Sequence, residues 1–456
     1  MASVYEYIEQ NRQSHLEELK EFLRIPSVST KSEHKPDIER ACNWVMEKMR
    51  AAGIENIVRH ETKGHPLVTG DWLHAAGKPT ILLYGHYDVQ PAEPFNLWTT
   101  PPFEPSVREG NLYARGAVDD KGQVHIHLKA LEAYKKVEGK FPINIKMLIE
   151  GEEEVGSENL YEFVKHNLDK LKNDALVVSD SGMLKKGCPS ITYGLRGLAY
   201  FQVGITGPAT DLHSGTFGGA VVNPITTLAE MISKLHDKRG RITIPGFYKD
   251  VVPLTGAERK AFAKLPWKES DFKKTVGTNA LVGEAGFSTL ERIWARPTLE
   301  LNGIWGGYTG EGAKTVLPSK AYAKLSTRLV PNQDPIKVSK ALEKYLRQLA
   351  PKGVQVEFKT LSTGRPWCAP YKHPIFQAAI TALEKGFGKK AVFIREGGSI
   401  PFVTHMYETF GKPCVLMGFG HPEENAHAPN EHLFLENYFG GIKSVAHFYE
   451  ELSKVA

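Results

Sequence analysis

The sequence predicts an α/β protein whose mostly parallel sheet carries helices on both faces, with a separate α+β segment inserted into it. Short apolar runs at Thr80–Tyr84, Ile143–Ile149 and Ala175–Val178 are typical of strands that are buried on both faces. A helical pattern over residues 123–139 separates the first two runs. Strand, helix and strand in this order predict parallel strands joined by a crossover helix.

The two ends of the chain add elements to the same sheet domain. The first 29 residues have an amphipathic helical pattern, Cys414–Met417 reads as one more strand, and Glu436–Leu452 reads as a last helix. A chain of 456 residues is too long for one ordinary core, so we expect two domains. We assign residues 1–195 and 368–456 to the sheet domain.

The middle of the chain, residues 196–367, has a different pattern. The stretches LAYFQVGITG and KAYAKLSTRLVP alternate apolar and polar residues, as strands with one exposed face do. Pro224–Lys238 and Pro335–Leu349 have helical patterns, and residues 239–296 read as loops and short elements. A separate α+β domain inserted into the sheet domain is the simplest interpretation.

Composition excludes several classes of protein. The formal net charge of +5 is small for this length and is not gathered into long Lys/Arg blocks, which argues against a nucleic-acid partner. No apolar run is long enough to span a membrane, and the N-terminus lacks the apolar core of a signal peptide. The four cysteines are far apart and form no CxxC pair, so we read them as reduced thiols and expect a cytoplasmic location.

Acidic and imidazole side chains follow each predicted strand of the sheet domain. The candidates are His86 and Asp88 after the first strand, Asp119 before the crossover helix, Glu152, Glu153 and Glu154 after the second strand, Asp180 after the third, and His421 and His427 after the last. The carboxyl ends of parallel strands form the ligand crevice of open α/β sheets. We therefore expect these side chains to meet at one edge.

So many carboxylates repel one another unless a cation lies among them. Imidazole and carboxylate without thiolate suit Zn, Mn or Co better than Ca or Mg. The ligands suffice for two ions about 3.5–4 Å apart with one bridging carboxylate. A carboxylate left over beside the attacking water would be the general base of a hydrolase.

Each candidate alone has an ordinary explanation. Asp119-Asp120 beside glycines is by default a turn, and the three consecutive glutamates are by default a solvated helix start. Their shared position after buried strands favours a site. His125 and His127 lie two residues apart on the crossover helix and point in different directions, so we interpret them as structural.

These residues, in this order, resemble the M20 family of metallopeptidases, and in particular its branch of cytosolic nonspecific dipeptidases and carnosinases. The resemblance covers almost the whole chain and lies in the segments GHYDVQP, ARGAVDDKGQ, GEEEVGSENL, VSDSG, YGLRG, DLHSG, STRLVPN, EGGSIP and AHAPNE. It implies two Zn or Mn ions per subunit and a cis peptide bond between Asp119 and Asp120. The implied metal ligands are His86, Asp119, Glu154, Asp180 and His427.

The resemblance also implies the roles of other residues. Asp119 would bridge both ions, Glu153 would be the general base, and Asp88 would orient His86 as metal-bound imidazoles require. The inserted domain is similar to the family's lid, which forms a homodimer interface. The implied substrate contacts are His213, which would reach the partner subunit's site and stabilise the oxyanion, and Arg328, Ser399 and Thr315, which would hold the terminal carboxylate.

The leading hypothesis is a dinuclear metallodipeptidase that cleaves dipeptides with a free terminal carboxylate, using water held between the ions and Glu153 as the base. An amidohydrolase acting on N-acyl amino acids, of the deacetylase or desuccinylase type, would use the same metal site. A non-catalytic binding protein on the same fold is disfavoured because every implied ligand and the base are present. Neither a G-x-S-x-G elbow nor a G-x-x-x-x-G-K-[ST] loop occurs.

Overall fold

Two compact units make up the computed structural model, which describes residues 3–455. The first unit comprises residues 1–193, 369–394 and 405–456, and the second comprises residues 194–368 and 395–404. The segment Arg395–Thr404 thus groups with the second unit, although we assigned everything after residue 367 to the sheet domain. The catalytic and lid roles of the two parts stay predictions.

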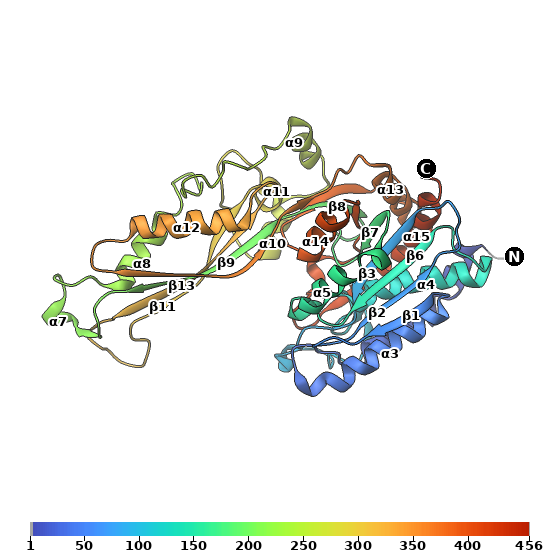
Figure 1. The fold of residues 1–456 in the computed structure, drawn as a ribbon, viewed down its shortest axis with the longest axis horizontal. Coiled ribbons are helices and arrows are strands. Elements are labelled where there is room, and N and C mark those ends of the chain that lie inside the picture. The colour runs from blue at the N-terminus through green and yellow to red at the C-terminus, as the bar shows by residue number, and fades with distance from the viewer. Residues whose placement is uncertain (1–2, 456) are drawn as a thin grey trace. The chain divides into compact units, whose positions relative to one another are not determined.

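The main sheet of the first unit runs in the order β1-β2-β6-β3-β7-β17-β8 (Figure 1). Its centre is parallel, since β3 pairs in parallel with β6 and β7, and β7 with β17. The predicted parallel α/β sheet is therefore confirmed. The strands are β1 (Glu55–His60), β2 (Leu67–Trp72), β3 (Thr80–His86), β6 (Asn144–Glu150), β7 (Ala175–Val178), β8 (Ser190–Leu195) and β17 (Cys414–Leu416).

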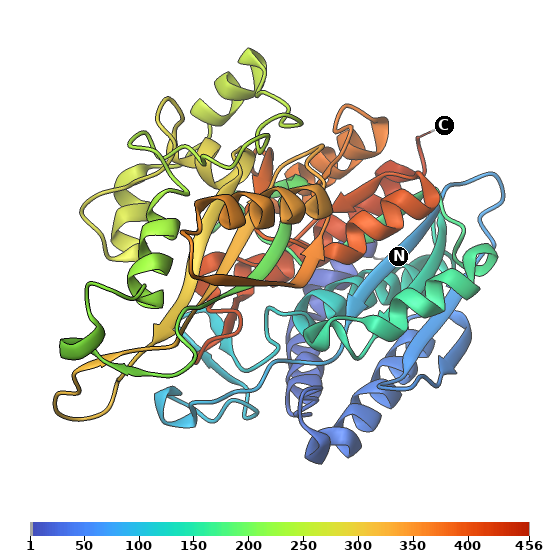
Figure 2. The same cartoon turned by 60° about the vertical axis from the view of Figure 1, so that its left-hand side comes forward.

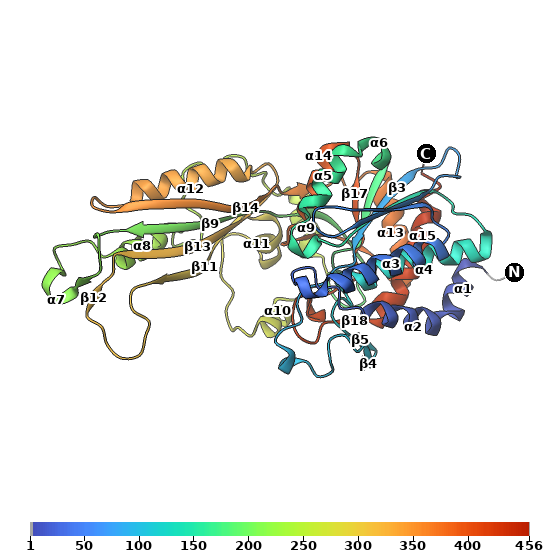
Figure 3. The same ribbon diagram turned by 60° about the horizontal axis from the view of Figure 1, so that its bottom comes forward.

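Helices cover both faces of this sheet, with α4 and α15 on one and α5 and α6 on the other (Figure 3). The crossover helix α4 starts after Asp120 and ends at Gly139, whose φ of 71° is the left-handed conformation that glycine readily adopts at a helix end. The N-terminal pattern forms two helices that part at Asn11. The helices are α1 (Val4–Gln10), α2 (Arg12–Leu23), α3 (Lys35–Ala51), α4 (Lys121–Glu138), α5 (Glu158–His166), α6 (Leu168–Leu171), α13 (Pro374–Phe387) and α15 (Leu435–Leu452).

A small three-stranded sheet, β18-β5-β4, joins distant parts of the first unit. Its strands are β4 (Ser106–Arg108), β5 (Asn111–Tyr113) and β18 (His432–Phe434). The register pairs His432 with Tyr113. This pairing lays the segment after His427 beside the connection that leads to Asp119.

The second unit is built on an antiparallel sheet in the order β11-β13-β9-β14. Buried and partly exposed residues alternate along β9 and β13, as the sequence predicts. Leu228 of α8 and Leu342 of α12 pack with Phe201 and Leu325 of the sheet in one core, and α12 lies along the sheet (Figure 1, Figure 2). The elements are α7 (Ser214–Phe217), α8 (Pro224–Ser233), α9 (Gly256–Ala263), α10 (Glu269–Val276), α11 (Thr289–Ala295), α12 (Pro335–Leu349), β9 (Gly197–Thr206), β10 (Leu212–His213), β11 (Thr298–Gly306), β12 (Val316–Leu317), β13 (Lys320–Leu329) and β14 (Gln355–Gly364).

Short elements complete the chain. Those at or across the borders between the units are β15 (Trp367–Cys368), β16 (Val392–Glu396) and α14 (Pro401–Phe410). The 3-10 turns are η1 (Ser32–His34), η2 (Phe95–Leu97), η3 (Glu153–Val155) and η4 (Pro422–Glu424). Among residues 3–455, no helix combines the length and the apolar character that crossing a membrane requires.

Candidate metal centre

The carboxyl ends of the central strands lie at one edge of the main sheet. His86 is the last residue of β3, Glu150 is the last residue of β6, and Asp180 lies two residues beyond β7. Because these strands are parallel, their ends point the same way. The buried apolar runs thus fix the strands, and the residues just beyond them carry the polar groups.

Two groups of side chains in this unit could each hold a metal ion. One is His86, Asp119 and Asp180, and the other is Asp119, Glu154 and His427. Within each group the ligand atoms lie within 4.8 Å of one another. Asp119 belongs to both groups. The five residues that the sequence predicts as ligands are therefore brought together, in the arrangement that a bridging carboxylate would give.

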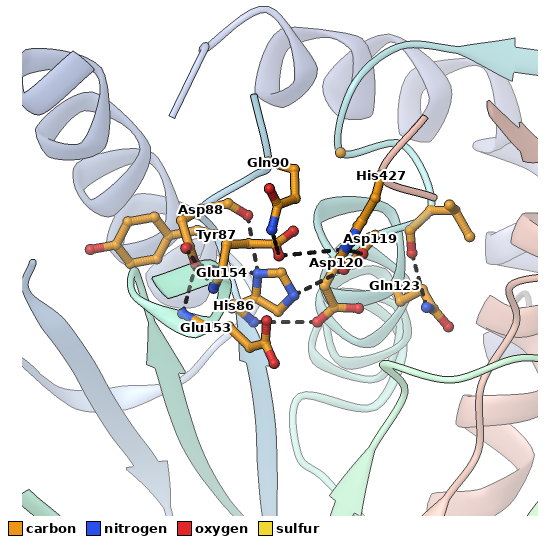
Figure 4. A network of polar contacts seen from close by, with 12 residues as sticks. His86, Tyr87, Asp88, Gln90, Asp119, Asp120, Gln123, Glu153, Glu154 and His427 are labelled. Carbon is orange, nitrogen blue, oxygen red and sulfur yellow. Dashed lines mark hydrogen bonds and ion pairs between the residues drawn. The ribbon is translucent and has the colours of Figure 1, made fainter. Parts of the chain in front are cut away.

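The contacts of Asp119 divide between its two oxygens (Figure 4). Its Oδ1 lies 3.1 Å from Nε2 of His86, and its Oδ2 lies 2.7 Å from Nε2 of His427. The same nitrogen of His427 is 3.4 Å from Oε2 of Glu154. The Asp119–Asp120 peptide bond is cis, as the resemblance implies. Each Asp119 oxygen thus faces a different imidazole and a different ligand group.

These contacts change the proton affinities of the groups. Hydrogen bonds to Asp119 and Glu154 raise the pKa of His427 to about 10. Burial alone would lower the pKa of His86, but its contacts with Asp119 and Asp88 outweigh burial and raise it well above the ordinary value. The two imidazolium ions therefore offset part of the carboxylate charge. A metal ion would take over that role, and its binding would release the protons.

Two other carboxyl groups at this edge, those of Glu153 and Asp120, hold their protons more tightly than usual. Burial raises the pKa of Glu153 to about 9, and the nearby Asp180 and Glu154 add to the shift against the opposing effect of His86. Burial, and then the charge of Asp180, raise the pKa of Asp120 well above its ordinary value. The site carries more negative charge than its own imidazoles neutralise, which is the condition that favours divalent cations.

The donor set fits such cations. Oε1 of Glu154 is buried and has no hydrogen-bond partner among the described residues, although a buried carboxylate oxygen is costly to leave unsatisfied. Imidazole and carboxylate ligands without thiolate are those that Zn and Mn accept. The residues present therefore fit the group that the sequence predicts.

Asp88 connects the two halves of the site. It is fully buried, its Oδ1 lies 3.3 Å from Nδ1 of His86, and its two oxygens accept hydrogen bonds from the backbone N–H groups of Glu153 and Glu154. Sequence reasoning paired Asp88 with His86 but missed these backbone contacts. It also missed Gln90, whose amide donates to Oε2 of Glu154 at 2.7 Å.

Other polar residues of this region lie outside the two groups. Glu152 accepts hydrogen bonds from the His65 backbone and from Asn159, and Nδ1 of His421 accepts one from a backbone N–H in η4. His125 and His127 are buried and bond in different directions, to Glu18 and Tyr438 and to Ser179 and Tyr449.

The four residues predicted to contact substrate all lie in the second unit, where they form two pairs. Oγ1 of Thr315 is 3.4 Å from Nε2 of His213, and both residues are exposed. Arg328 donates to Oγ of Ser399 at 2.9 Å. Arg328 and Ser399 are thus brought together, as the sequence predicts. Thr315, which the sequence places with them at the terminal carboxylate, lies beside His213 instead, and the two pairs are separate.

The separation of the pairs follows from the sheet register. His213 belongs to β10, which pairs with β12 just before β13 begins at Lys320 (Figure 3). Arg328 lies eight residues further along β13, which at 3.4 Å per residue is roughly 27 Å. One dipeptide is far too short to contact both pairs of a single chain.

Arg196 is a residue of this second unit that sequence reasoning missed, although it quoted the YGLRG segment. Its backbone carbonyl accepts from Ser399 Oγ, its Nε donates to the Gly397 carbonyl, and its Nη1 is buried without a partner among the described residues. Burial, and then the nearby charge of Arg328, lower the pKa of Arg196 to about 10. Neither guanidinium pairs with a carboxylate in the described residues, so this spot suits an anion.

Comparison with known proteins identifies the chain. The model of peptidase family M20/M25/M40 matches residues 82–451. The chain belongs to this family. It is therefore an enzyme of the metallopeptidase class, as the sequence predicts.

The relatives of this M20 chain match it over nearly its whole length. It is 34% identical to the "Cys-Gly metallodipeptidase dug1" of Schizosaccharomyces pombe over 99% of the chain and 98% of the relative. It is 31% identical to the human "Beta-Ala-His dipeptidase" over 100% of the chain and 93% of the relative. A solved structure, the M20 family metallo-carboxypeptidase Sso-CP2 from Sulfolobus solfataricus, is 34% identical, covers 97% of this chain and 99% of its own, and superposes with a TM-score of 0.85.

Proposed function

We propose that this M20 enzyme is a dinuclear metal-dependent dipeptidase that hydrolyses the peptide bond of dipeptides with a free terminal carboxylate. The observation that carries the proposal is the sharing of Asp119 between two groups of metal ligands. The relatives named as dipeptidases at 31% and 34% identity support the substrate class. We propose two Zn or Mn ions, held by His86, Asp119, Glu154, Asp180 and His427.

Two divalent cations at this site would polarise the scissile carbonyl and make water a nucleophile near neutral pH. Glu153 is the general base of the proposal. Burial raises its pKa to about 9 in the metal-free site, and two cations nearby would lower that pKa toward the neutral range in which a carboxylate accepts a proton from water and then delivers it to the leaving amine. Asp88 holds this base in place through the backbone N–H of Glu153.

Arg328, with Ser399, is the proposed recognition site for the substrate's terminal carboxylate. Arg328 is partly buried and bonded to Ser399, and Arg196 adds a second guanidinium beside them. The two guanidinium groups repel each other, the charge of Glu300 offsets this repulsion only in part, and a bound anion would neutralise them. A planar guanidinium also binds a carboxylate through two parallel hydrogen bonds.

A homodimer is part of the proposal, with His213, supported by Thr315, stabilising the oxyanion in the partner's site. β13 runs roughly 27 Å from its start, near the strand that pairs with His213, to Arg328, and this length supports the assignment, because the two residues of one chain cannot serve the same dipeptide. The edge strand β11 exposes Leu301, Ile304 and Trp305, apolar side chains that a second copy could cover.

We also propose that the enzyme is located in the cytoplasm. Cys42, Cys188 and Cys368 are free thiols, and a reducing compartment keeps thiols in that form.

The test is a substrate panel on metal-stripped enzyme reloaded with single ions. Dipeptides, tripeptides, N-acetyl and N-succinyl amino acids would be offered to enzyme carrying Zn or Mn. We expect turnover of dipeptides to require metal and to exceed that of every other class. Faster cleavage of N-acyl amino acids would establish the amidohydrolase alternative, and faster removal of C-terminal residues from tripeptides would establish a carboxypeptidase. Full activity without metal would refute the mechanism.

A further inference from the structure

A buried ion pair lies beside the proposed metal site without belonging to it. Glu431 is fully buried, Arg115 is 1% exposed, and Nη1 of Arg115 donates to Oε2 of Glu431 at 2.7 Å. The same Oε2 accepts a hydrogen bond from the Gly116 N–H, and Oε1 accepts from the N–H groups of Val118 and Asp119. Four donors thus converge on one carboxylate.

This pair contacts three segments that carry proposed ligands. Glu431 bonds the backbone of Asp119 directly and follows His427 by four residues. Nη2 of Arg115 donates to the carbonyl of Pro91, in the segment that follows His86 and Asp88. The register of β18 and β5 delivers Glu431 to this place, since its own carbonyl accepts from the Ala114 N–H.

The backbone of these segments needs such support. His427 has a φ of 63°, in the left-handed region. A residue with a side chain rarely adopts this conformation unless its surroundings impose it. Asn430 follows His427 by three residues, and its side chain fixes this segment with two more hydrogen bonds. It accepts one from the Thr99 N–H and donates one to the Leu97 carbonyl. Together these contacts hold His427 and Asp119 where the two ligand groups require them.

We propose that Glu431 and Arg115 are positioning residues that fix the ligand-bearing segments in metal-binding geometry before any metal arrives. The proposal rests on the metal site of the proposed function. Groups that orient metal ligands typically raise metal affinity by about 10- to 100-fold. The pair therefore acts on the affinity of the site for metal and on the coordination of Asp119, and takes no part in bond making.

The variants follow from the contacts. Glu431→Gln keeps the size of the side chain but turns an NH₂ group toward two of the four donors, so the Asp119 segment loses its anchor. Arg115→Lys keeps the positive charge but loses the fork that reaches both Glu431 and Pro91. Its effect should be in the same direction and smaller.

A matched control lies in the same unit. Glu18 on α2 is a mostly buried carboxylate with three donors, His125, Lys129 and Lys48, on α3 and α4. It bonds none of the ligand-bearing segments. Glu18→Gln therefore disturbs a comparable buried network and should lower thermal stability without changing metal affinity.

The measurement is the zinc affinity of the full-length metal-stripped proteins, determined by competition with a chromophoric chelator after circular dichroism has verified folding. We expect Glu431→Gln to bind zinc about 10- to 100-fold more weakly than the wild type, Arg115→Lys to fall between them, and Glu18→Gln to match the wild type. The visible spectrum of the cobalt-substituted protein should change in Glu431→Gln and stay as in the wild type in Glu18→Gln.

Each other outcome counts against the proposal. Wild-type zinc affinity in folded Glu431→Gln and Arg115→Lys would overturn it while leaving the metal site intact. Equal losses of zinc affinity in Glu18→Gln and Glu431→Gln would show that the loss follows from lower stability in general, and would also overturn the proposal. If Glu431→Gln does not fold, Arg115→Lys alone decides. A wild-type protein that binds no zinc would instead refute the proposed function.

Discussion

The two units hold their polar residues in different ways. In the first unit, the predicted metal ligands converge at one sheet edge, and Asp88 and Glu431 anchor them from fully buried positions. In the second unit, the predicted substrate residues form two pairs, one at the small β10-β12 sheet and one near the end of β13, and His213 and Thr315 are exposed.

The difference shows which parts of the proposed active site one chain can supply by itself. The first unit brings the predicted ligands and the predicted base together by its own contacts, so metal binding should need no partner. The second unit cannot bring His213 and Arg328 to the same small substrate within one chain. Catalysis should therefore depend on association where metal binding does not. Three substitutions test this comparison, and a fourth tests how a histidine is buried in the first unit.

Glu153→Gln should have the largest effect, because it removes the base and leaves the proposed ligands in place. We expect kcat to fall by roughly 10²- to 10⁴-fold. The bound metal should remain at the wild-type level by elemental analysis. Near-normal turnover in the purified variant would exclude this role for Glu153, and a loss of metal would assign it to the ligands instead.

His213→Ala should lower kcat by about 10²- to 10³-fold, the usual cost of one oxyanion donor. Mixing it with Glu153→Gln and allowing subunits to exchange should restore activity. In a mixed dimer one site has an intact base and receives His213 from the other chain, so a statistical mixture should reach roughly a quarter of wild-type activity. The absence of any recovery on mixing, with exchange verified by mass spectrometry, would place His213 in its own chain's site or outside catalysis.

Arg328→Lys should act on substrate binding. Lysine keeps the charge but cannot form two parallel bonds to a carboxylate, so kcat/KM should fall by about 10- to 100-fold, mainly through a higher KM. The matched probe is a dipeptide amide, which lacks the carboxylate and should be cleaved equally by both proteins. An equal loss on the acid and the amide would contradict a role in carboxylate recognition.

His127→Gln should have the smallest effect and concerns stability. Burial lowers the pKa of His127 to about 3 in the folded state, while in the unfolded chain it has the ordinary value of about 6.5. At any pH between these two values, only the unfolded chain takes up the proton. The folded state therefore loses stability as the pH falls below about 6.5 in the wild type but not, through this group, in the variant. The difference in unfolding free energy between the two should shift by about 2 kcal/mol from pH 6.5 to pH 5 in denaturant titrations. A difference independent of pH would contradict burial of a neutral His127.

Much of the fold and the ligand set could be predicted from local patterns. The apolar runs of β3, β6 and β7 are continuous because both faces are buried, and the residues at their carboxyl ends share an edge because the strands are parallel. The fold and the enzyme class are confirmed. The roles of the individual site residues stay predictions.

What the sequence did not predict depends on contacts between distant segments. Glu431 ends the segment AHAPNE, but it bonds backbone N–H groups more than 300 positions away, and only the fold brings these groups together. Gln90 and Arg196 lie in quoted segments, but their partners, Glu154 and the Gly397–Ser399 turn, are set by the fold. The strand β14 was missed because most of its residues are exposed and give no clear alternation.

The most direct test of the shared carboxylate is an anomalous difference map from crystals grown with excess zinc and measured at the zinc edge. We predict two peaks per chain, about 3.5–4 Å apart, with one oxygen of Asp119 on each. His86 and Asp180 should contact one peak, and Glu154 and His427 the other. A single peak, or two peaks with Asp119 bound to only one of them, would contradict the account.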